Sequence, residues 1–256
     1  MTMNKTVAKS LADGRRSGHK MKAYPGDAPE TKGQALELQQ AVNIELGWQP
    51  IGWKIACTSR RAQEALKTEG PFPGRLFAER QFSSGQKVPT EADNFRVTEP
   101  EIVFRMGRSL PPRGRPYDTD EALAAVDAVH PGLEIVNPRL PKGFDDVVEW
   151  YIADGALNDA IVIGPPSRPL PRQDYARIQA IAQRNGMVVG TGAGANALAG
   201  PEIVLTWLAN DLSARGLPLE AGSIVTTGVI TEMFSANAGD EITATFAGIG
   251  EVSARF

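Results

Sequence analysis

The 256-residue sequence has few of the side chains that form disulfide-bonded or histidine-rich sites. Cys57 is its only cysteine, so an internal disulfide framework and a cysteine-based zinc site are both excluded. We interpret Cys57 as a small core residue rather than a nucleophile. Only two histidines are present, His19 and His130, which excludes a metal centre built from several imidazoles.

Long apolar runs and an excess of positive charge are missing too. No run of about 18 apolar residues is present, so we expect no transmembrane helix. The first six residues lack the apolar core of a signal peptide, and we expect a cytoplasmic protein. The net charge is −3 and the pI about 5.6, which argues against nucleic acid as a partner. With 42% hydrophobic residues the composition is that of a globular protein of one large or two small domains.

Two glutamates stand two residues apart in a strand-like stretch, residues 96–107 (RVTEPEIVFRMG). Alternate residues of a strand point to the same face, so Glu99 and Glu101 project together, roughly 7 Å apart along the strand. Two carboxylates on one face repel unless something positive lies between them. A hard divalent cation such as Mg²⁺ or Mn²⁺ takes oxygen ligands and fits this pattern. The alternative is a pair of solvated side chains on an exposed strand.

Two further charged residues lie inside apolar, strand-like runs. Glu134 lies in residues 131–136 (PGLEIV), where an unpaired carboxylate is costly and a shared metal would compensate it. Lys54 lies in residues 52–57 (GWKIAC), and a buried lysine loses its charge readily, so it can act as an acid or base. Its neighbours Trp53 and Ile55 point to the opposite face. The alternative is a lysine that extends to the strand edge and pairs with any nearby carboxylate.

Strands cluster in some regions and helices in others, which favours an α+β fold over alternating α/β. We divide the chain into an N-terminal helical segment, residues 1–50, and a catalytic domain, residues 51–256. The expected helices are 4–17, 31–46 capped by Thr31, 60–67, 120–129 capped by Thr119, 145–150 and 201–215, and the further expected strands are 156–163, 176–182, 223–227, 240–246 and 251–256. Asn185-Gly186 predicts a hairpin turn. Residues 70–74 (GPFPG) form either a stiff connector or a wall beside the site. The glycine-rich residues 190–194 lack the Lys-Ser/Thr pair of a P-loop and the preceding strand and following helix of a dinucleotide-binding motif.

Motifs along nearly the whole chain resemble the fumarylacetoacetase-like superfamily, in its 2-keto-4-pentenoate hydratase and 4-oxalocrotonate decarboxylase branch. The matching stretches are residues 11–16 (LADGRR), 52–55 with 58–59, 99–101 with Phe104 and Gly107, 133–136, 152–154, 162–164, 191–195, 207–210 and 239–242. The resemblance implies a mixed β-sandwich or barrel-like roll with flanking helices.

The resemblance also implies a chemistry. The substrate would be a small 2-oxo acid or its dienol, such as 2-hydroxypenta-2,4-dienoate. Mg²⁺ or Mn²⁺ on Glu99, Glu101 and Glu134 would stabilise an enolate, with Lys54 orienting the carboxylate or moving the proton. The residues implied in substrate binding are Phe72, Leu76, Asp154, Asn158 and Thr227.

This sequence departs from the hydratase pattern in two places. Where those enzymes carry an Asp pair, residues 74–79 (GRLFAE) keep only Glu79, which becomes a candidate catalytic group. Where they carry small hydroxyl residues, residues 155–158 read GALN. Both departures leave the groups proposed for the metal and the enolate intact. A hydratase is the first expectation, and the alternatives are a 4-oxalocrotonate-type decarboxylase and a non-catalytic partner subunit that binds a metal and a small acid. We also expect a homo-oligomer, with association to a related hydratase or decarboxylase as a further expectation.

Overall fold

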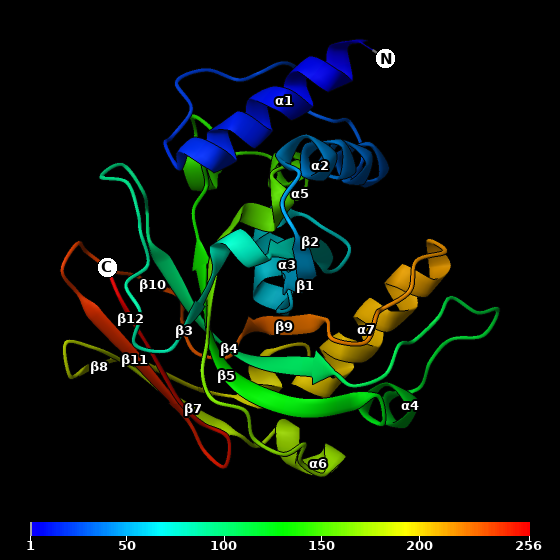
Figure 1. Cartoon of the computed structure of the whole chain (residues 1–256), viewed down its shortest axis with the longest axis vertical. Helices are drawn as coiled ribbons and strands as arrows, with labels where there is room; N and C mark the ends of the chain where they lie inside the picture. Colours follow the sequence, from blue (N-terminus) through cyan, green and yellow to red (C-terminus); the bar gives the residue numbers. More distant parts are fainter. Residues whose placement is uncertain (1) are drawn as a thin grey trace.

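Two β-sheets form the centre of the computed structural model, which describes residues 2–256 (Figure 1). The larger sheet has eight strands in the order β2-β1-β9-β4-β5-β6-β3, with β10 paired to β4, and the smaller, antiparallel sheet has four in the order β12-β11-β7-β8. The strands are β1 (Pro50–Ala56), β2 (Phe72–Phe77), β3 (Gln81–Ser83), β4 (Val97–Met106), β5 (Val126–Val136), β6 (Asn158–Ile163), β7 (Gln179–Arg184), β8 (Met187–Ala193), β9 (Ile224–Val229), β10 (Phe234–Ser235), β11 (Glu241–Phe246) and β12 (Gly250–Arg255).

Helices flank the sheets, which confirms the α+β prediction. They are α1 (Thr2–Ser17), α2 (Lys32–Leu46), α3 (Arg60–Leu66), α4 (Thr119–Leu123), α5 (Val148–Ala153), α6 (Arg172–Tyr175) and α7 (Pro201–Ala214), with short 3-10 turns η1 (Ala78–Arg80), η2 (Gly143–Asp145), η3 (Gly155–Leu157) and η4 (Gly194–Asn196). Among the described residues, no helix combines the length and the apolar character needed to cross a bilayer.

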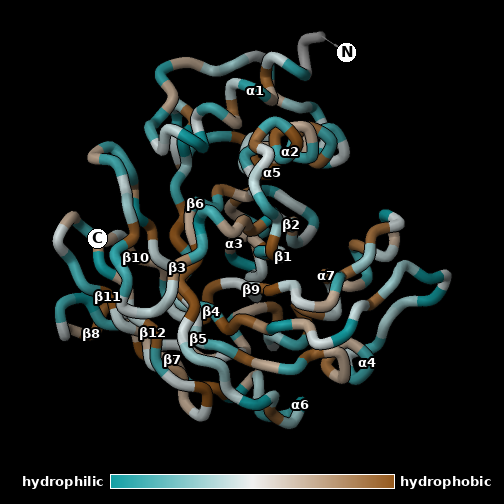
Figure 2. Tube along the Cα trace, in the orientation of Figure 1, coloured by the Kyte–Doolittle hydropathy of each residue, from teal (hydrophilic) through white to brown (hydrophobic). Residues whose placement is uncertain are grey.

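The main hydrophobic core joins the two sheets and α7. Ile102 and Phe104 of β4 are fully buried in it, together with Ile242 and Phe246 of β11 and Leu208 of α7. Figure 2 shows the apolar stretches along the strands and α7, whereas the loop that follows β4 is mostly hydrophilic. Because alternate residues of β4 enter this core, the side chains between them face the other side of the sheet. That other side carries the candidate site.

The N-terminal helices pack on the same chain. Leu11 of α1 and Val42 of α2 are buried in a second cluster that includes Trp150 of α5, and Figure 1 shows α1 and α2 together on the side of α5. Thr31 caps α2 as predicted, because its side chain accepts a hydrogen bond from the Gln34 amide. The predicted boundary between residues 50 and 51 stays a prediction.

Residues 70–74 are not a plain connector, and the other alternative, a wall beside the site, stays a prediction. From Phe72 the chain forms β2, which pairs antiparallel with β1 and places Pro73 opposite Ile55. β2 is an edge strand of the larger sheet. An edge strand tolerates a proline because one side of its backbone has no partner to bond.

The helix predicted over 120–129 is much shorter. It spans Thr119–Leu123, and its N-cap is Asp118, which forms a capping box with Glu121. β5 takes the following residues from Val126 onward and pairs with β4 along ten positions of β4. Long-range pairing with β4 therefore overrides the local helical pattern.

Several local predictions are confirmed. Asn185 and Gly186 both have positive φ, 53° and 79°, as a two-residue type I′ turn requires between β7 and β8. β7 itself begins at Gln179, later than predicted, because α6 occupies the preceding residues. Helix α7 starts with Pro201, and Gly216 follows it with a φ of 70°.

One close backbone approach yields a stability prediction. Gly52 of β1 lies beside Ile224 of β9, and a Cβ at Gly52 would lie 1.9 Å from the Ile224 carbonyl oxygen. We expect Gly52→Ala to lower the free energy of unfolding by about 1–3 kcal/mol, since β1 must move away from β9. Urea denaturation measures this change.

Gly70→Ala is the matched control, because a Cβ at Gly70 would have no neighbour within 4 Å. We expect it to change stability by less than about 0.5 kcal/mol. Equal stability of Gly52→Ala and the wild type would contradict the close packing of β1 on β9.

Candidate metal centre

Three glutamates meet on one face of β4 and β5. Glu99 of β4 lies directly opposite Glu134 of β5, and Glu101 lies two residues further along β4, opposite Gly132. Each of the three offers a carboxylate oxygen, and these oxygens all lie within 4.8 Å of one another. Two oxygens on one cation with bonds of about 2.0–2.6 Å can be no more than roughly 5 Å apart, so the spacing fits a single ion.

Each of the two fully buried carboxylates has one oxygen that the protein holds. Glu101 Oε2 accepts a hydrogen bond from the Gly228 amide at 2.7 Å. Glu134 Oε1 accepts one from Asn158 Nδ2 at 2.8 Å and lies 3.0 Å from Lys54 Nζ.

The remaining oxygens of these two carboxylates, Glu101 Oε1 and Glu134 Oε2, are buried and have no partner among the described residues. Burying an anionic oxygen without a donor or a cation is costly. The donor set therefore suits a hard divalent cation such as Mg²⁺ or Mn²⁺, which binds carboxylate oxygen.

Lys54 is a buried cation beside these carboxylates. Only 2% of its surface is exposed, so the alternative of a lysine that extends to the strand edge is wrong. Trp53 and Ile55 lie in the core on the opposite face, as the alternation predicted. Burial by itself lowers the pKa of Lys54, but the surrounding carboxylates, above all Glu134, outweigh it and raise this pKa above its ordinary value. In the protein without a bound cation, the expectation that Lys54 loses its charge readily is therefore wrong.

The carboxyl groups show the cost of sharing one buried face. Burial raises the pKa of Glu99 to about 7, with Lys54 opposing and Glu134 adding to the shift. Burial, followed by repulsion from Glu134 and Glu99, raises the pKa of Glu101 well above its ordinary value. One lysine does not compensate three carboxylates, and a divalent cation would supply the missing charge.

Apolar side chains border the carboxylates. Phe72 is buried in a cluster that includes Val97 and Val136, each two residues from a predicted metal ligand on the same face of its strand. Leu76 lies on the same face of β2 as Phe72 and is fully buried. Both residues stay proposed substrate contacts. Burial also raises the pKa of the nearby Cys57 thiol to about 11, which agrees with its interpretation as a non-nucleophilic residue.

The structure corrects the placement of Glu79. Its exposed carboxylate accepts a hydrogen bond from the Gln49 amide. It follows Phe77, which pairs with Pro50, and four residues of strand, roughly 13 Å, separate Pro50 from Lys54. Glu79 is therefore not part of the glutamate cluster.

Three predicted substrate contacts are engaged inside the protein. The Asn158 side-chain amide donates to Glu134 Oε1, and its role in substrate binding stays a prediction. The buried Asp154 carboxylate lies 3.1 Å from Arg139 Nη2, so it takes part in an internal ion pair, and its role in substrate binding stays a prediction. The Thr227 hydroxyl donates to the Ile102 carbonyl oxygen at 2.8 Å. A role of Thr227 in substrate binding stays a prediction.

Sequence reasoning missed Thr226 and Gly228. Thr226 pairs with Val103, so it shares the face of Glu101, and its buried hydroxyl has no partner among the described residues. Two adjacent threonines in a strand point to opposite faces, so an error of one position exchanges them. No residue pattern marks the Gly228 amide as a donor, because the donor is part of the backbone.

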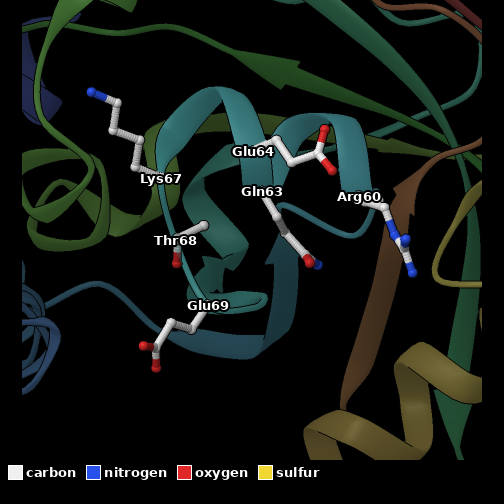
Figure 3. Close-up of a pocket in the computed structure, with 6 residues that line it drawn as sticks. All are labelled: Arg60, Gln63, Glu64, Lys67, Thr68 and Glu69. Atoms are coloured by element: carbon white, nitrogen blue, oxygen red, sulfur yellow. The ribbon is translucent and has the colours of Figure 1, made fainter.

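A surface hollow lies elsewhere, on α3 and the turn that follows it (Figure 3). Its lining residues are Arg60, Gln63, Glu64, Lys67, Thr68 and Glu69. None of them belongs to the predicted site, and the hollow has no apolar wall of the kind that holds a small ligand.

Residues 61–256 match the family model described as Fumarylacetoacetate (FAA) hydrolase C-terminal. The chain belongs to this family. The resemblance inferred from its motifs is thereby confirmed.

Relatives with two activities align with almost the whole chain of this fumarylacetoacetate hydrolase family member. The 2-keto-4-pentenoate hydratase of Paraburkholderia xenovorans (strain LB400) is 32% identical, over 98% of this chain and 93% of the relative. The 4-oxalocrotonate decarboxylase of Pseudomonas putida is 28% identical, over 98% of this chain and 95% of the relative.

A solved structure of 4-oxalocrotonate decarboxylase from Pseudomonas putida G7, complexed with magnesium and adipate, superimposes with a TM-score of 0.88. It is 27% identical and the match covers 99% of this chain and 97% of that one. The barrel-like roll with flanking helices expected for the family is confirmed. The family model begins after Lys54. The alignments with the relatives cover 98–99% of this chain, so they include both α1 and the candidate site.

Loss of one glutamate tests the metal centre of this family member. We expect Glu134→Gln to weaken Mn²⁺ binding by at least about tenfold, because it removes a charged ligand and leaves Lys54 without its nearest carboxylate. Isothermal titration calorimetry measures the affinity.

Glu79→Gln is the control, since this exposed glutamate lies outside the cluster, and we expect its Mn²⁺ affinity to equal that of the wild type. Unchanged Mn²⁺ affinity in folded Glu134→Gln would contradict the assignment of Glu134 as a ligand.

Proposed function

We propose that the protein is a divalent-metal-dependent lyase that acts on a small 2-oxo acid or its dienol, as a 2-keto-4-pentenoate-type hydratase. The observation that carries the proposal is the pair of buried carboxylate oxygens without partners, Glu101 Oε1 and Glu134 Oε2, beside Glu99 and a buried lysine. The similarity to hydratases and decarboxylases over nearly the full length supports the same class of reaction.

The proposed ligands are Glu99, Glu101 and Glu134, and the proposed ion is Mg²⁺ or Mn²⁺. When bound, such an ion polarises the 2-oxo group and stabilises the enolate that forms when a proton moves. The chain's part is to orient the ligands: the Gly228 amide holds Glu101, and the Asn158 amide holds Glu134. Both donors leave the second oxygen of their carboxylate free for the ion.

Lys54 has two proposed tasks. Three carboxylates carry one negative charge more than a divalent cation neutralises, and the Lys54 ammonium offsets it. An ammonium group has three donors, and Glu134 Oε1 occupies one of them. The others can bind the substrate carboxylate and hold or release a proton at Nζ during addition to the double bond.

Decarboxylation is the second candidate, and the similarity to 4-oxalocrotonate decarboxylase over 98% of the chain supports it. Loss of CO₂ from the distal carboxylate of an unsaturated 2-oxo diacid leaves its bond electrons conjugated with the 2-oxo group. The result is the same kind of enolate, so the three glutamates serve either reaction equally. Product analysis separates the two, because only the decarboxylase releases CO₂. A partner subunit without activity would bind Mn²⁺ and produce neither product.

Cytoplasmic location, self-association and association with a related hydratase or decarboxylase belong to the same proposal. The family members named above act on small organic acids, and this chain offers no basic excess for nucleic acid.

Lys54→Met tests the chemical role of the lysine, because it keeps the buried stem and removes the charge. We expect the variant to stay folded and to retain Mn²⁺, but to consume 2-hydroxypenta-2,4-dienoate about 10²–10⁴-fold more slowly than the wild type. The loss of the dienoate ultraviolet absorbance follows the reaction.

Lys87→Met, which removes an exposed lysine, is the control and should keep wild-type turnover. If Lys54→Met keeps more than about a tenth of wild-type activity, Lys54 is a structural residue, because loss of a proton-transfer group slows a reaction by about 10²–10⁴-fold.

A further inference from the structure

A buried arginine of the N-terminal helix reaches the backbone next to the metal centre. Arg15 lies on α1 within the stretch LADGRR, which the proposed chemistry leaves without a role, and only 5% of its surface is exposed. Its Nη1 donates to the Asp154 carbonyl oxygen and its Nη2 to the Asn158 carbonyl oxygen, both at 3.3 Å. A single guanidinium thus spans the two ends of the segment between these residues.

That segment has an unusual backbone. Gly155, Ala156 and Leu157 have φ values of 68°, 57° and 61°, so three consecutive residues are left-handed. Only glycine adopts this conformation without a steric penalty, so Ala156 and Leu157 are strained. Such strain persists where the surrounding structure holds it, and it is concentrated at functional sites.

The residue at the end of the strained segment is the one that orients a proposed metal ligand. The Asn158 side chain donates to Glu134 Oε1, which leaves Glu134 Oε2 free for the ion. The Asn158 carbonyl accepts from Arg15 and, at 3.1 Å, from Arg139 Nη2. The backbone position of Asn158 therefore depends on two guanidinium groups.

We propose that Arg15 is a positioning residue: it holds the 155–157 segment so that the Asn158 amide keeps Glu134 directed at the metal. The inference rests on the proposed metal-dependent function and adds the N-terminal helix to the metal centre. Hydrogen-bond partners of metal ligands set affinity by about 10–100-fold, although they do not touch the ion.

Arg15→Met is the variant that tests this, because it keeps the stem and removes both hydrogen bonds. The nearby charges stay balanced without Arg15, since Arg139 pairs with Asp154 and Asp159, and Arg80 pairs with Asp159. We expect the Kd for Mn²⁺, measured by calorimetry, to rise about 10–100-fold.

Arg16→Met is the matched control on the same helix. Arg16 contacts Asp13 and the carbonyl oxygens of Glu45 and Leu46, so it also fixes α1. Among the described residues, none of its hydrogen bonds or ion pairs reaches residues 154–158. We expect Arg16→Met to change the Mn²⁺ Kd by less than about twofold. A loss of affinity in Arg15→Met alone separates positioning of the ligand from general anchoring of the helix.

A double-mutant cycle identifies the route. If Arg15 acts through Asn158, then Arg15→Met adds little to the loss of Mn²⁺ affinity already caused by Asn158→Ala. Additive losses of Mn²⁺ affinity in the double variant would overturn the proposal. So would wild-type Mn²⁺ affinity in folded Arg15→Met if Asn158→Ala binds Mn²⁺ more weakly.

Should Arg15→Met fail to fold, Arg15→Lys replaces it, because one ammonium cannot span both carbonyls. Wild-type Mn²⁺ affinity in Arg15→Lys would likewise overturn the inference. Absence of Mn²⁺ binding by the wild type would refute the proposed function itself.

Discussion

The Glu134 carboxylate is held by Asn158 and Lys54 through one oxygen, and the proposed site depends on this shared contact. Like charges directly opposite on neighbouring strands destabilise a sheet, and Glu134 lies opposite Glu99. Lys54 offsets part of this repulsion, and the core on the other face of the sheet offsets the cost of keeping these charges in place. The hydrophobic face of β4 thus stabilises a strand whose opposite face holds an acidic cluster.

Local patterns predicted much of the fold. The turn at Asn185-Gly186 and the ends of α7 depend on backbone preferences of one or two residues, so they are readable without knowledge of the rest of the chain. The alternation of Glu99 and Glu101 placed both carboxylates on one face for the same reason. β2 and the start of β5 were not predicted, because these segments become strands by pairing with β1 and β4. The local sequence does not show which strand will lie beside a segment in the folded protein.

The site was predictable where a charged side chain interrupts an apolar strand, as Lys54 and Glu134 do. It was not predictable where the contact is made by the backbone, as with the Gly228 amide, or where distant segments meet, as with Arg15 and Asn158. Glu79 illustrates the opposite error, since a carboxylate near the matching motif lies at the wrong end of β1. Two opposing effects act on the pKa of Lys54: burial lowers it, and the neighbouring carboxylates raise it. The sequence indicated only the burial, because it does not show which carboxylates lie beside Lys54.

The most direct test of this account is a crystal structure of the protein with Mn²⁺ and its anomalous difference map. The account predicts one strong peak within about 2.6 Å of carboxylate oxygens from Glu99, Glu101 and Glu134. It also predicts that Asn158 and Lys54 keep their contacts with Glu134. A map without a peak between these glutamates, or with manganese only at exposed carboxylates, would contradict it.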